Sequence, residues 1–252
     1  MRPSLNNKHE AGSARSRLFL LVVAALLLAA TSPAWAGKGN ANNPGVMPPQ
    51  ANPQGQSYAE WLSEWWTGYW PMPYEYYDAH PLGQSGHVGH LFSGTSGTID
   101  LTVPAGTMLF LSPYSCATGD FPQVWDMPYN DPVTGMEYAS EADFAKAFNG
   151  RVVDGVSVRC WIDGREVRNL QAYRLQAPFG GVYPEGNWLD APPDSQYVGL
   201  AEGKFLMLAP LPVGTHTIQV WTMMPEEFLP YFGFAGEWTT VFHITVQGRS
   251  RK

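Results

Sequence analysis

The first predicted element of the chain has a helical hydrophobic period. Over Ser57–Trp70, apolar side chains recur every three or four positions, the spacing of a helix with one buried face. Ser57 and Glu60 form an S-x-x-E capping box at its start, and two prolines follow its end. The pattern therefore predicts an amphipathic helix whose stripe includes Trp61 and Trp65, docked on the rest of the protein.

Further along the chain the period changes to two, which indicates strands with one buried face. The alternating or continuously apolar runs span residues 97–103, 107–112, 156–162, 204–209, 215–222 and 237–246. Asp163-Gly164 follows one run and is a strong signal for a two-residue hairpin. Many short strands separated by Gly and Pro predict a mainly β fold, a jelly-roll-like β-sandwich with an N-terminal amphipathic helix and one short inserted helix.

The inserted helix is expected over Ser140–Phe148. Ser140 is a capping residue with Asp143 at the third position, and Asn149-Gly150 is a typical helix end. Residues 113–139 are rich in turn formers and are expected to be irregular. Residues 177–200 are expected to form a long loop with short extended pieces.

The N-terminus has the three zones of a secretory signal. Basic residues up to Arg17 precede the apolar run Leu18–Ala30, and Ala34-Trp35-Ala36 is a small-x-small cleavage site. Thirteen residues of helix rise about 20 Å, which is too short for a hydrocarbon core of about 30 Å. We therefore expect residues 1–36 to be removed, leaving a chain without a membrane span that is periplasmic or extracellular.

Composition divides the remaining chain into three parts. Residues 37–56 are Gly, Asn, Pro and Gln with few apolar anchors, and are expected to be a flexible leader. Residues 57–247 contain no linker and no internal repeat, and are expected to form a single domain. Residues 248–252 form a basic tail.

Charge narrows the range of partners. Residues 37–252 carry 11 basic and 21 acidic side chains, a net charge of −10. An acidic surface repels phosphate backbones, so nucleic acid is excluded as a partner. The same charge is an ordinary way to keep an exported protein soluble. The sequence leaves the oligomeric state open.

Cys116 and Cys160 are the two cysteines of the chain. In an oxidising compartment an even pair is read as a disulfide, and we expect these residues to be bridged. The alternative is two separate buried thiols. Two cysteines without C-x-x-C spacing do not indicate a metal site.

Several stretches together resemble a known family. They are SYAEWLSEWWTGYW, VPAGTMLFL, VRCWIDGREVRNLQAYR, KFLMLAPLPVGTHTIQVW and TTVFHITV. In this order they resemble an uncharacterised family of exported bacterial proteins with a Trp-rich N-terminal helix and a β-rich, sandwich-like body. The resemblance implies export and a β-rich body, and it transfers no catalytic residue.

Residues with catalytic or metal-binding chemistry do not form a recognisable motif. His87 and His90 point to opposite faces of an extended segment, His216 is expected to be a hydrogen-bonded core residue, and His243 is expected to be exposed. There is no H-E-x-x-H and no G-x-S-x-G. We therefore predict no catalytic residues, no metal site and no cofactor, and the sequence favours a protein that is not an enzyme.

Aromatic residues are the unusual resource of this sequence. Trp70, Tyr74, Tyr76 and Tyr77 cluster at the proline-broken end of the first helix. Flat aromatic faces beside polar groups suit sugar rings, so these four are the candidate ligand-binding residues and a glycan is the expected ligand class. The packing alternative is that the rings cover an edge of the sandwich. The alternative functions are a secreted hydrolase with a carboxylate-based site and a structural or partner-binding envelope protein.

Overall fold

The computed structural model describes residues 43, 45–72, 82–93, 96–119, 128–131, 133–187 and 189–248. These residues all belong to one compact unit, Lys38–Lys252. The expected signal peptide lies outside the described residues, so cleavage and export stay predictions. Within the described ranges, no helix has both the length and the apolar character needed to cross a membrane.

Two five-stranded sheets form the body of the described chain. Sheet A has the order β1 (Leu82–Ser85), β2 (Val88–Phe92), β4 (Met108–Gly119), β10 (Gln196–Leu208) and β9 (Arg174–Val182). Sheet B has the order β3 (Gly97–Pro104), β12 (Gly236–Gln247), β11 (Gly214–Met224), β7 (Ser157–Ile162) and β8 (Arg165–Glu166). Both sheets are mixed, because β2 runs parallel to β4 and β3 runs parallel to β12.

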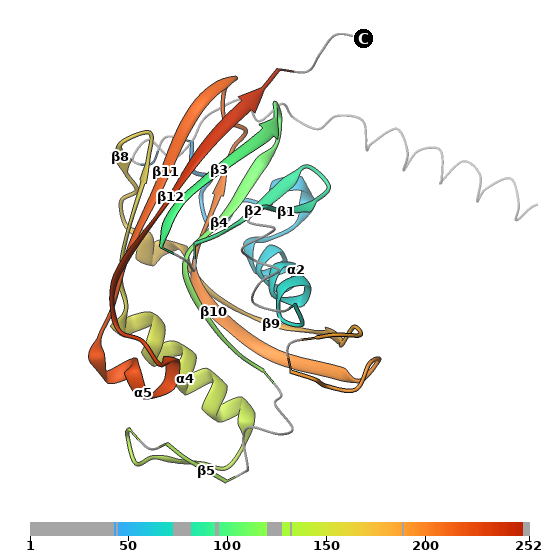
Figure 1. The fold of residues 1–252 in the computed structure, drawn as a ribbon, viewed down its shortest axis with the longest axis vertical. Helices are drawn as coiled ribbons and strands as arrows, with labels where there is room; N and C mark the ends of the chain where they lie inside the picture. The colour runs from blue at the N-terminus through green and yellow to red at the C-terminus, as the bar shows by residue number, and fades with distance from the viewer. Residues whose placement is uncertain are drawn as a thin grey trace, which may run out of the picture. The chain divides into compact units, whose positions relative to one another are not determined.

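Short elements and helices complete the fold. A small ribbon pairs β5 (Tyr129–Asn130) with β6 (Glu137–Tyr138). The α-helices are α2 (Tyr58–Tyr69), α4 (Glu141–Gly155) and α5 (Leu229–Phe232), and the 3₁₀ turns are η1 (Pro53–Gly55), η2 (Leu170–Tyr173) and η3 (Glu226–Phe228). The predicted mainly β sandwich with an N-terminal helix and an inserted helix is confirmed (Figure 1).

Sheet A is the middle layer of the body. Helix α2 packs against β9 and β10, whereas α4 packs against β4 and β10, and β4 also contacts β7 and β11 of sheet B. In Figure 1, α2 and sheet B lie on opposite sides of the long strands of sheet A. Residues 201–208 of β10 are accordingly buried without alternation, as expected for a strand covered on both faces.

Helix α2 forms where the sequence predicts it. Both hydrogen bonds of the capping box between Ser57 and Glu60 are present. Trp61 and Trp65 are 3% and 2% exposed, and the Trp65 ring contacts the Phe110 and Phe205 rings of sheet A at 6.3 and 5.5 Å between centroids. The predicted docking of the tryptophan stripe is therefore confirmed.

The same helix also contacts the outer strand of sheet A. The Thr67 hydroxyl donates to the carbonyl of Gly180 in β9 at 3.2 Å and accepts from its N–H at 3.4 Å. The Tyr197 hydroxyl donates to the Thr67 carbonyl at 2.6 Å. These contacts tie the middle of α2 to the β9–β10 end of the sheet.

Helix α4 is longer than predicted. The expected stop at Asn149-Gly150 is wrong, since the helix continues to Gly155. Asn149 is fully buried and its side chain bonds to the Thr118 hydroxyl and the Leu200 carbonyl, both at 2.7 Å. Val152 is also fully buried. Tertiary contacts with sheet A therefore outweigh the local tendency of Asn-Gly to end a helix.

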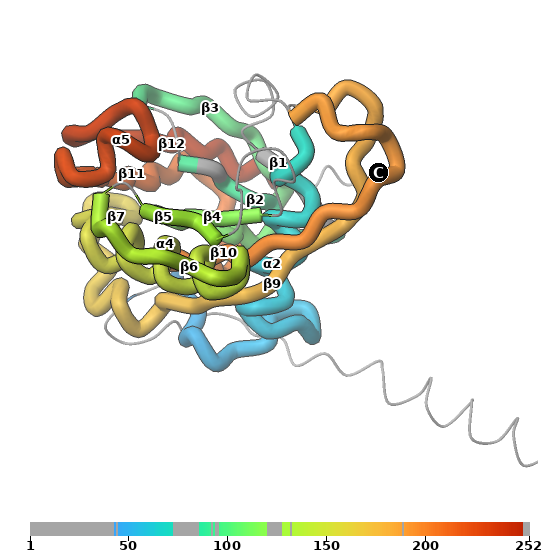
Figure 2. Tube along the Cα trace, turned by 90° about the horizontal axis from the view of Figure 1, so that it is seen from below, coloured from blue at the N-terminus to red at the C-terminus, as the bar shows by residue number. Residues whose placement is uncertain are grey.

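A polar cluster fixes the β5–β6 ribbon to the helices. Asp131 accepts hydrogen bonds from Arg151 of α4 at 3.0 Å and from the Tyr231 hydroxyl of α5. The Tyr129 ring lies 4.6 Å from that of Phe144, and Figure 2 shows β5 and β6 beside α4. Burial opposes ionisation of Asp131, but hydrogen bonds, first from Tyr231, lower its pKa to about 2.

Two other predictions are corrected by the fold. The flexible leader over 37–56 is wrong for residues 45–56, because Val46 is fully buried and pairs with Leu208 of β10. The loop expected over 177–200 is wrong at both ends, where β9 continues to Val182 and β10 begins at Gln196. In both places the Gly and Pro content predicts a loop, but contacts with residues distant in sequence order the segment.

The predicted disulfide between Cys116 and Cys160 is also wrong. Both residues are buried free thiols. Cys116 lies in β4 of sheet A and packs in the cluster around α4, whereas Cys160 lies in β7 of sheet B and packs in the main core. Burial raises the pKa of Cys116 to about 12 and raises that of Cys160 as well, so both thiols stay protonated.

Candidate functional site

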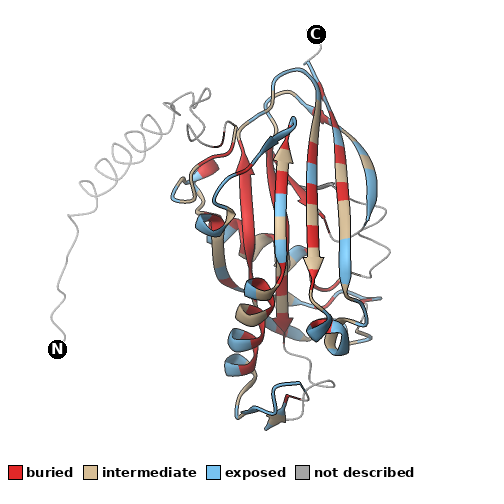
Figure 3. Ribbon diagram, turned by 90° about the vertical axis from the view of Figure 1, so that its left-hand side faces the viewer, coloured by how far each residue is buried: buried red, intermediate tan, exposed pale blue. Residues whose placement is uncertain are grey.

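The outer face of sheet B is the site of interest. The helices α2 and α4 both pack on sheet A. Figure 3 shows sheet B facing outward, with buried and exposed positions alternating along its strands. In β7, Cys160 and Ile162 are buried, while Trp161 between them is partly exposed. In β11, Gln219 and Trp221 lie on the same outer face. The pleat therefore directs one set of side chains to solvent.

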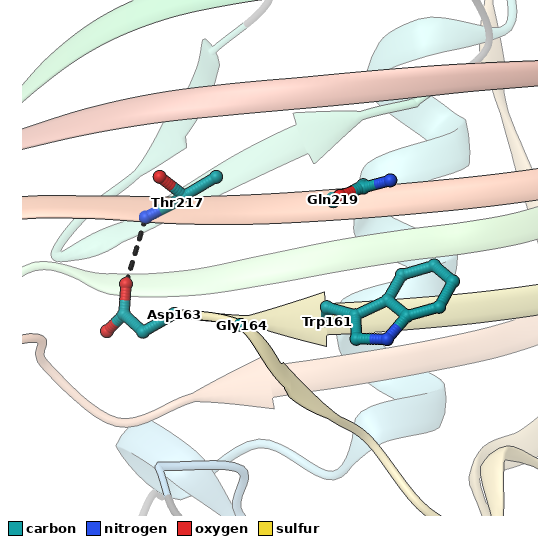
Figure 4. Close-up of a pocket in the computed structure, with 5 residues that line it drawn as sticks. All are labelled: Trp161, Asp163, Gly164, Thr217 and Gln219. Atoms are coloured by element: carbon teal, nitrogen blue, oxygen red, sulfur yellow. Dashed lines mark hydrogen bonds between the residues drawn. The ribbon is translucent and has the colours of Figure 1, made fainter.

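A shallow hollow of about 470 Å³ lies on this face. Its lining comes from two adjacent strands and one turn, namely Trp161, Asp163, Gly164, Thr217 and Gln219. Trp161 and Gln219 are directly opposite in the β7–β11 register. Figure 4 shows the indole and the amide side by side above the strands. The Gln219 amide makes no hydrogen bond to the part of the chain that the structure describes.

The turn below the hollow has the geometry that the sequence predicts. Asp163 and Gly164 have φ angles of 49° and 74°, and they link Ile162 to Arg165, which are paired. Two left-handed residues in succession define the two-residue hairpin favoured by Asp-Gly. The turn places the Asp163 carboxylate at the edge of the hollow.

The Asp163 carboxylate is held by two donors. Its Oδ1 accepts from the Thr217 backbone N–H at 2.9 Å, and its Oδ2 lies 2.8 Å from Nδ1 of His216. The other ring nitrogen of His216 lies 2.9 Å from the Pro212 carbonyl oxygen. An ionised carboxylate and a carbonyl only accept, so this geometry satisfies both ring nitrogens when the imidazole is protonated.

The pKa of His216 reflects these contacts. Burial acts to lower it, but the hydrogen bonds to Asp163 and the Pro212 carbonyl and the charge of Asp163 raise the pKa above its ordinary value. The expected hydrogen bonding of His216 is confirmed. The expected core position is wrong, because its side chain is 12% exposed and lies outside the buried core. His216 thus connects the Asp163-Gly164 turn to the segment before β11 and offsets the charge of Asp163.

An ion pair flanks the hollow on the other side of Trp161. Arg159 donates from Nε and Nη2 to the Glu166 carboxylate at 2.7 and 3.1 Å. Its guanidinium carbon lies 4.8 Å from the Trp161 ring centroid, within the range of a cation–π contact. Both charged side chains are well exposed, so the pair is weak and its geometry adaptable.

Of the four candidate residues from the sequence, the structure describes Trp70, which does not line this hollow. Trp70 is 6% exposed, donates from Nε1 to the Tyr183 hydroxyl at 3.3 Å and packs against Phe179. Its ring therefore belongs to the core. Tyr74, Tyr76 and Tyr77 lie outside the described residues, so their role in ligand binding stays a prediction.

The sequence analysis did not identify Trp161 and Gln219. The available signal was the alternation in 156–162 and 215–222, which places Trp161 and Gln219 on the polar sides of their strands. The strand register that makes them neighbours is a long-range property. Alternation alone therefore predicts that Trp161 and Gln219 are exposed, but not that they are neighbours.

The other titratable side chains do not indicate a metal site. Among the described residues, no three His, Cys, Asp or Glu side chains come together as metal ligands. His90 is buried, which lowers its pKa to about 4, and His243 is exposed beside Asp100 at 3.2 Å. The hollow is lined by one carboxylate, that of Asp163, so it lacks the carboxylate pair of a typical glycosidase.

Comparisons with known proteins give no family. No protein-family model matches the chain. No curated protein matches it in sequence. Among solved structures, it is similar to a cysteine protease inhibitor from Entamoeba histolytica, with a TM-score of 0.24 and 10% identity over 64% of this chain and 96% of that one. A likeness of this degree transfers neither fold nor function, so the functional reasoning depends on the site itself.

Proposed function

We propose that this chain is a ligand-binding β-sandwich protein that binds a glycan on the outer face of sheet B. The observation that carries the proposal is the hollow in which the partly exposed Trp161 indole faces solvent beside the unpaired amide of Gln219. A pyranose ring has an apolar CH face and a rim of hydroxyls. An indole with adjacent amide and hydroxyl groups is complementary to both.

Charge around the hollow favours a neutral ligand. The body of the protein is acidic, yet near Trp161 Arg159 is paired with Glu166 and Asp163 is paired with His216. An anion would meet the repulsion of the whole protein. A cation would meet carboxylates that already have partners. Neutral hydroxyl-rich ligands avoid both costs.

The expected location agrees with this proposal. A secreted or periplasmic protein, as the N-terminal pattern predicts, meets polysaccharides of cell envelopes and surroundings. The uncharacterised family that the sequence resembles has the same expected location. Export therefore supports a glycan as the ligand class without identifying the sugar.

The proposal is tested by measuring glycan binding. The protein is expressed from the full chain and purified. We expect a neutral glycan to be retained in an array and to give a measurable Kd by calorimetry. Trp161→Ala should weaken that binding about fivefold or more, since an aromatic platform contributes about 1 kcal/mol or more. Its melting temperature should change little because the indole is only partly buried.

Phe234→Ala is the matched control, since it removes an exposed ring, 49% accessible, from the loop that follows α5. This variant should bind like the parent. The proposal is rejected if no neutral glycan binds, or if Trp161→Ala and the parent have the same affinity.

A further inference from the structure

A second indole lies on the outer face of sheet B, away from the hollow. In the antiparallel β7–β11 register, Trp161 is opposite Gln219 and Trp221 is opposite Arg159. Trp161 and Trp221 are therefore diagonal neighbours on one face. Their Cα atoms are expected to be about 7–8 Å apart, as for such positions in general. Trp221 is partly exposed and does not line the hollow.

The second indole is held in place. Its Nε1 donates to the Glu237 carboxylate of β12 at 3.1 Å. On the other flank it faces Arg159 across the strand pair. An indole with its polar atom bonded at one edge presents its apolar surface in a fixed orientation. Trp221 therefore offers a ligand the same kind of apolar indole surface as Trp161.

Arg159 supplies a polar group beside the Trp161 indole, since its guanidinium carbon lies 4.8 Å from the Trp161 ring centroid. Glu166 accepts from its Nε and Nη2, and the Nη1 amino group has no hydrogen bond within the described part of the chain. Guanidinium nitrogens only donate. The outer face thus has two indoles that are diagonal across β7 and β11, and a free donor group beside the first of them.

From this arrangement we infer that the ligand is an unbranched neutral glycan several sugars long, lying across β7 and β11. The inference depends on the proposed function and specifies its ligand. Trp161 stacks against one sugar above the hollow, Trp221 stacks against a later sugar of the same chain, and Arg159 Nη1 donates to an oxygen of the chain beside Trp161. A single terminal sugar would fill the hollow and leave Trp221 unused.

The test is chain-length dependence of binding. The probes are β-1,4-linked oligosaccharides of glucose and of N-acetylglucosamine, with two, four and six sugars, titrated by calorimetry. We expect the tetramer of the series that binds to have at least about tenfold higher affinity than its dimer, as for a second stacked ring. The hexamer should add little.

Variants assign the gain to Trp221. Trp221→Ala should weaken the tetramer about tenfold and leave the dimer unchanged, because only the longer chain reaches that ring. Trp221→Phe keeps an aromatic face and should restore most of the loss. Trp161→Ala should weaken both lengths. Equal melting temperatures for parent and variants exclude a folding defect.

The outcomes separate the two proposals. Equal affinities for dimer and tetramer, or equal loss of both in Trp221→Ala, overturn the inference while binding that depends on Trp161 keeps the proposed function. A tetramer gain that Trp221→Ala does not reduce also overturns it. Binding of no probe to the parent overturns the inference, while retention of another neutral glycan in the array keeps the proposed function.

Discussion

Tryptophans are used in two different ways in this protein. On α2, Trp61, Trp65 and Trp70 are all buried against sheet A. On sheet B, Trp161 and Trp221 lie on the outer face and are only partly covered. The residue type is the same, and what differs is whether a second layer covers the face on which it lies.

This difference shows where function is expected. A helix with apolar side chains spaced three and four apart has one broad apolar face, and burying that face stabilises the fold. A strand on an open sheet face has no such need, so an indole there is free to contact a ligand. The tryptophan-rich helix is conspicuous in the sequence, yet it forms the core, and the less conspicuous indoles of sheet B form the candidate site.

The largest expected effect is on the inner set. Trp65→Ala removes a ring that packs against Phe110, Phe205 and Tyr69. We expect the free energy of unfolding in urea to fall by about 3–5 kcal/mol, the range for a large core aromatic. Trp161→Ala, on the outer face, should change it by less than about 1 kcal/mol. Equal losses for the two variants would remove the distinction between the two sets.

A smaller effect is expected from a glycine beneath the inner set. A Cβ at Gly119 would lie 2.4 Å from Cζ2 of the Trp70 ring. Gly119→Ala should therefore reduce the free energy of unfolding by about 1–3 kcal/mol through overpacking. Urea denaturation measures this value, and an unchanged midpoint would mean that Trp70 is not packed on β4.

Gly68→Ala is the control for that substitution. Gly68 lies within α2, is exposed, and has no atom within 4 Å of its Cβ position. Alanine is a better helix former there, so the same assay should show a gain of up to about 1 kcal/mol. The two Gly→Ala changes thus have opposite expected signs.

The smallest effect concerns the outer face and depends on pH. The folded-state pKa of His216 is raised above its ordinary value. Its stabilising contribution is therefore complete below about pH 6.5, the unfolded value, and is lost as pH rises through the folded pKa. Relative to His216→Gln, the parent should be more stable at about pH 5.5 by at most about 1 kcal/mol and lose that advantage by about pH 9.

Amide NMR gives a direct measure of the same contact. The Thr217 N–H donates to Asp163, so its proton shift should titrate with the pKa of His216 in the parent and lose that transition in His216→Gln. A Thr217 shift that is identical in both proteins across this range would show that His216 does not position Asp163.

The parts of the fold that the sequence predicts are those that depend on local chemistry. Ser57 and Glu60 begin α2 by a contact three residues apart, and Asp163-Gly164 forms its turn from backbone preference alone. Asn149 shows the limit. Its buried bonds to Thr118 and Leu200 extend α4 past the predicted end, and those partners are 31 and 51 residues away.

The candidate site could not be predicted from local sequence patterns either, because it also depends on contacts between residues that are distant in sequence. Trp161 and Gln219 are 58 positions apart and become neighbours only through the β7–β11 register. The cysteines illustrate the converse. Cys116 and Cys160 suggested a bridge by their number, but they pack in separate clusters on strands of different sheets. Sequence separation alone therefore predicted neither that Trp161 and Gln219 are neighbours nor that Cys116 and Cys160 are not.

The contact between Thr67 and Gly180 has a consequence for self-association. An outer strand normally offers its unpaired N–H and C=O groups to any extended chain, and this is a common route to aggregation. At Gly180 of β9, one hydroxyl of α2 occupies both groups. Loss of the hydroxyl in Thr67→Val would expose this main-chain pair and favour edge-to-edge oligomers, so Thr67 protects the colloidal stability of the protein.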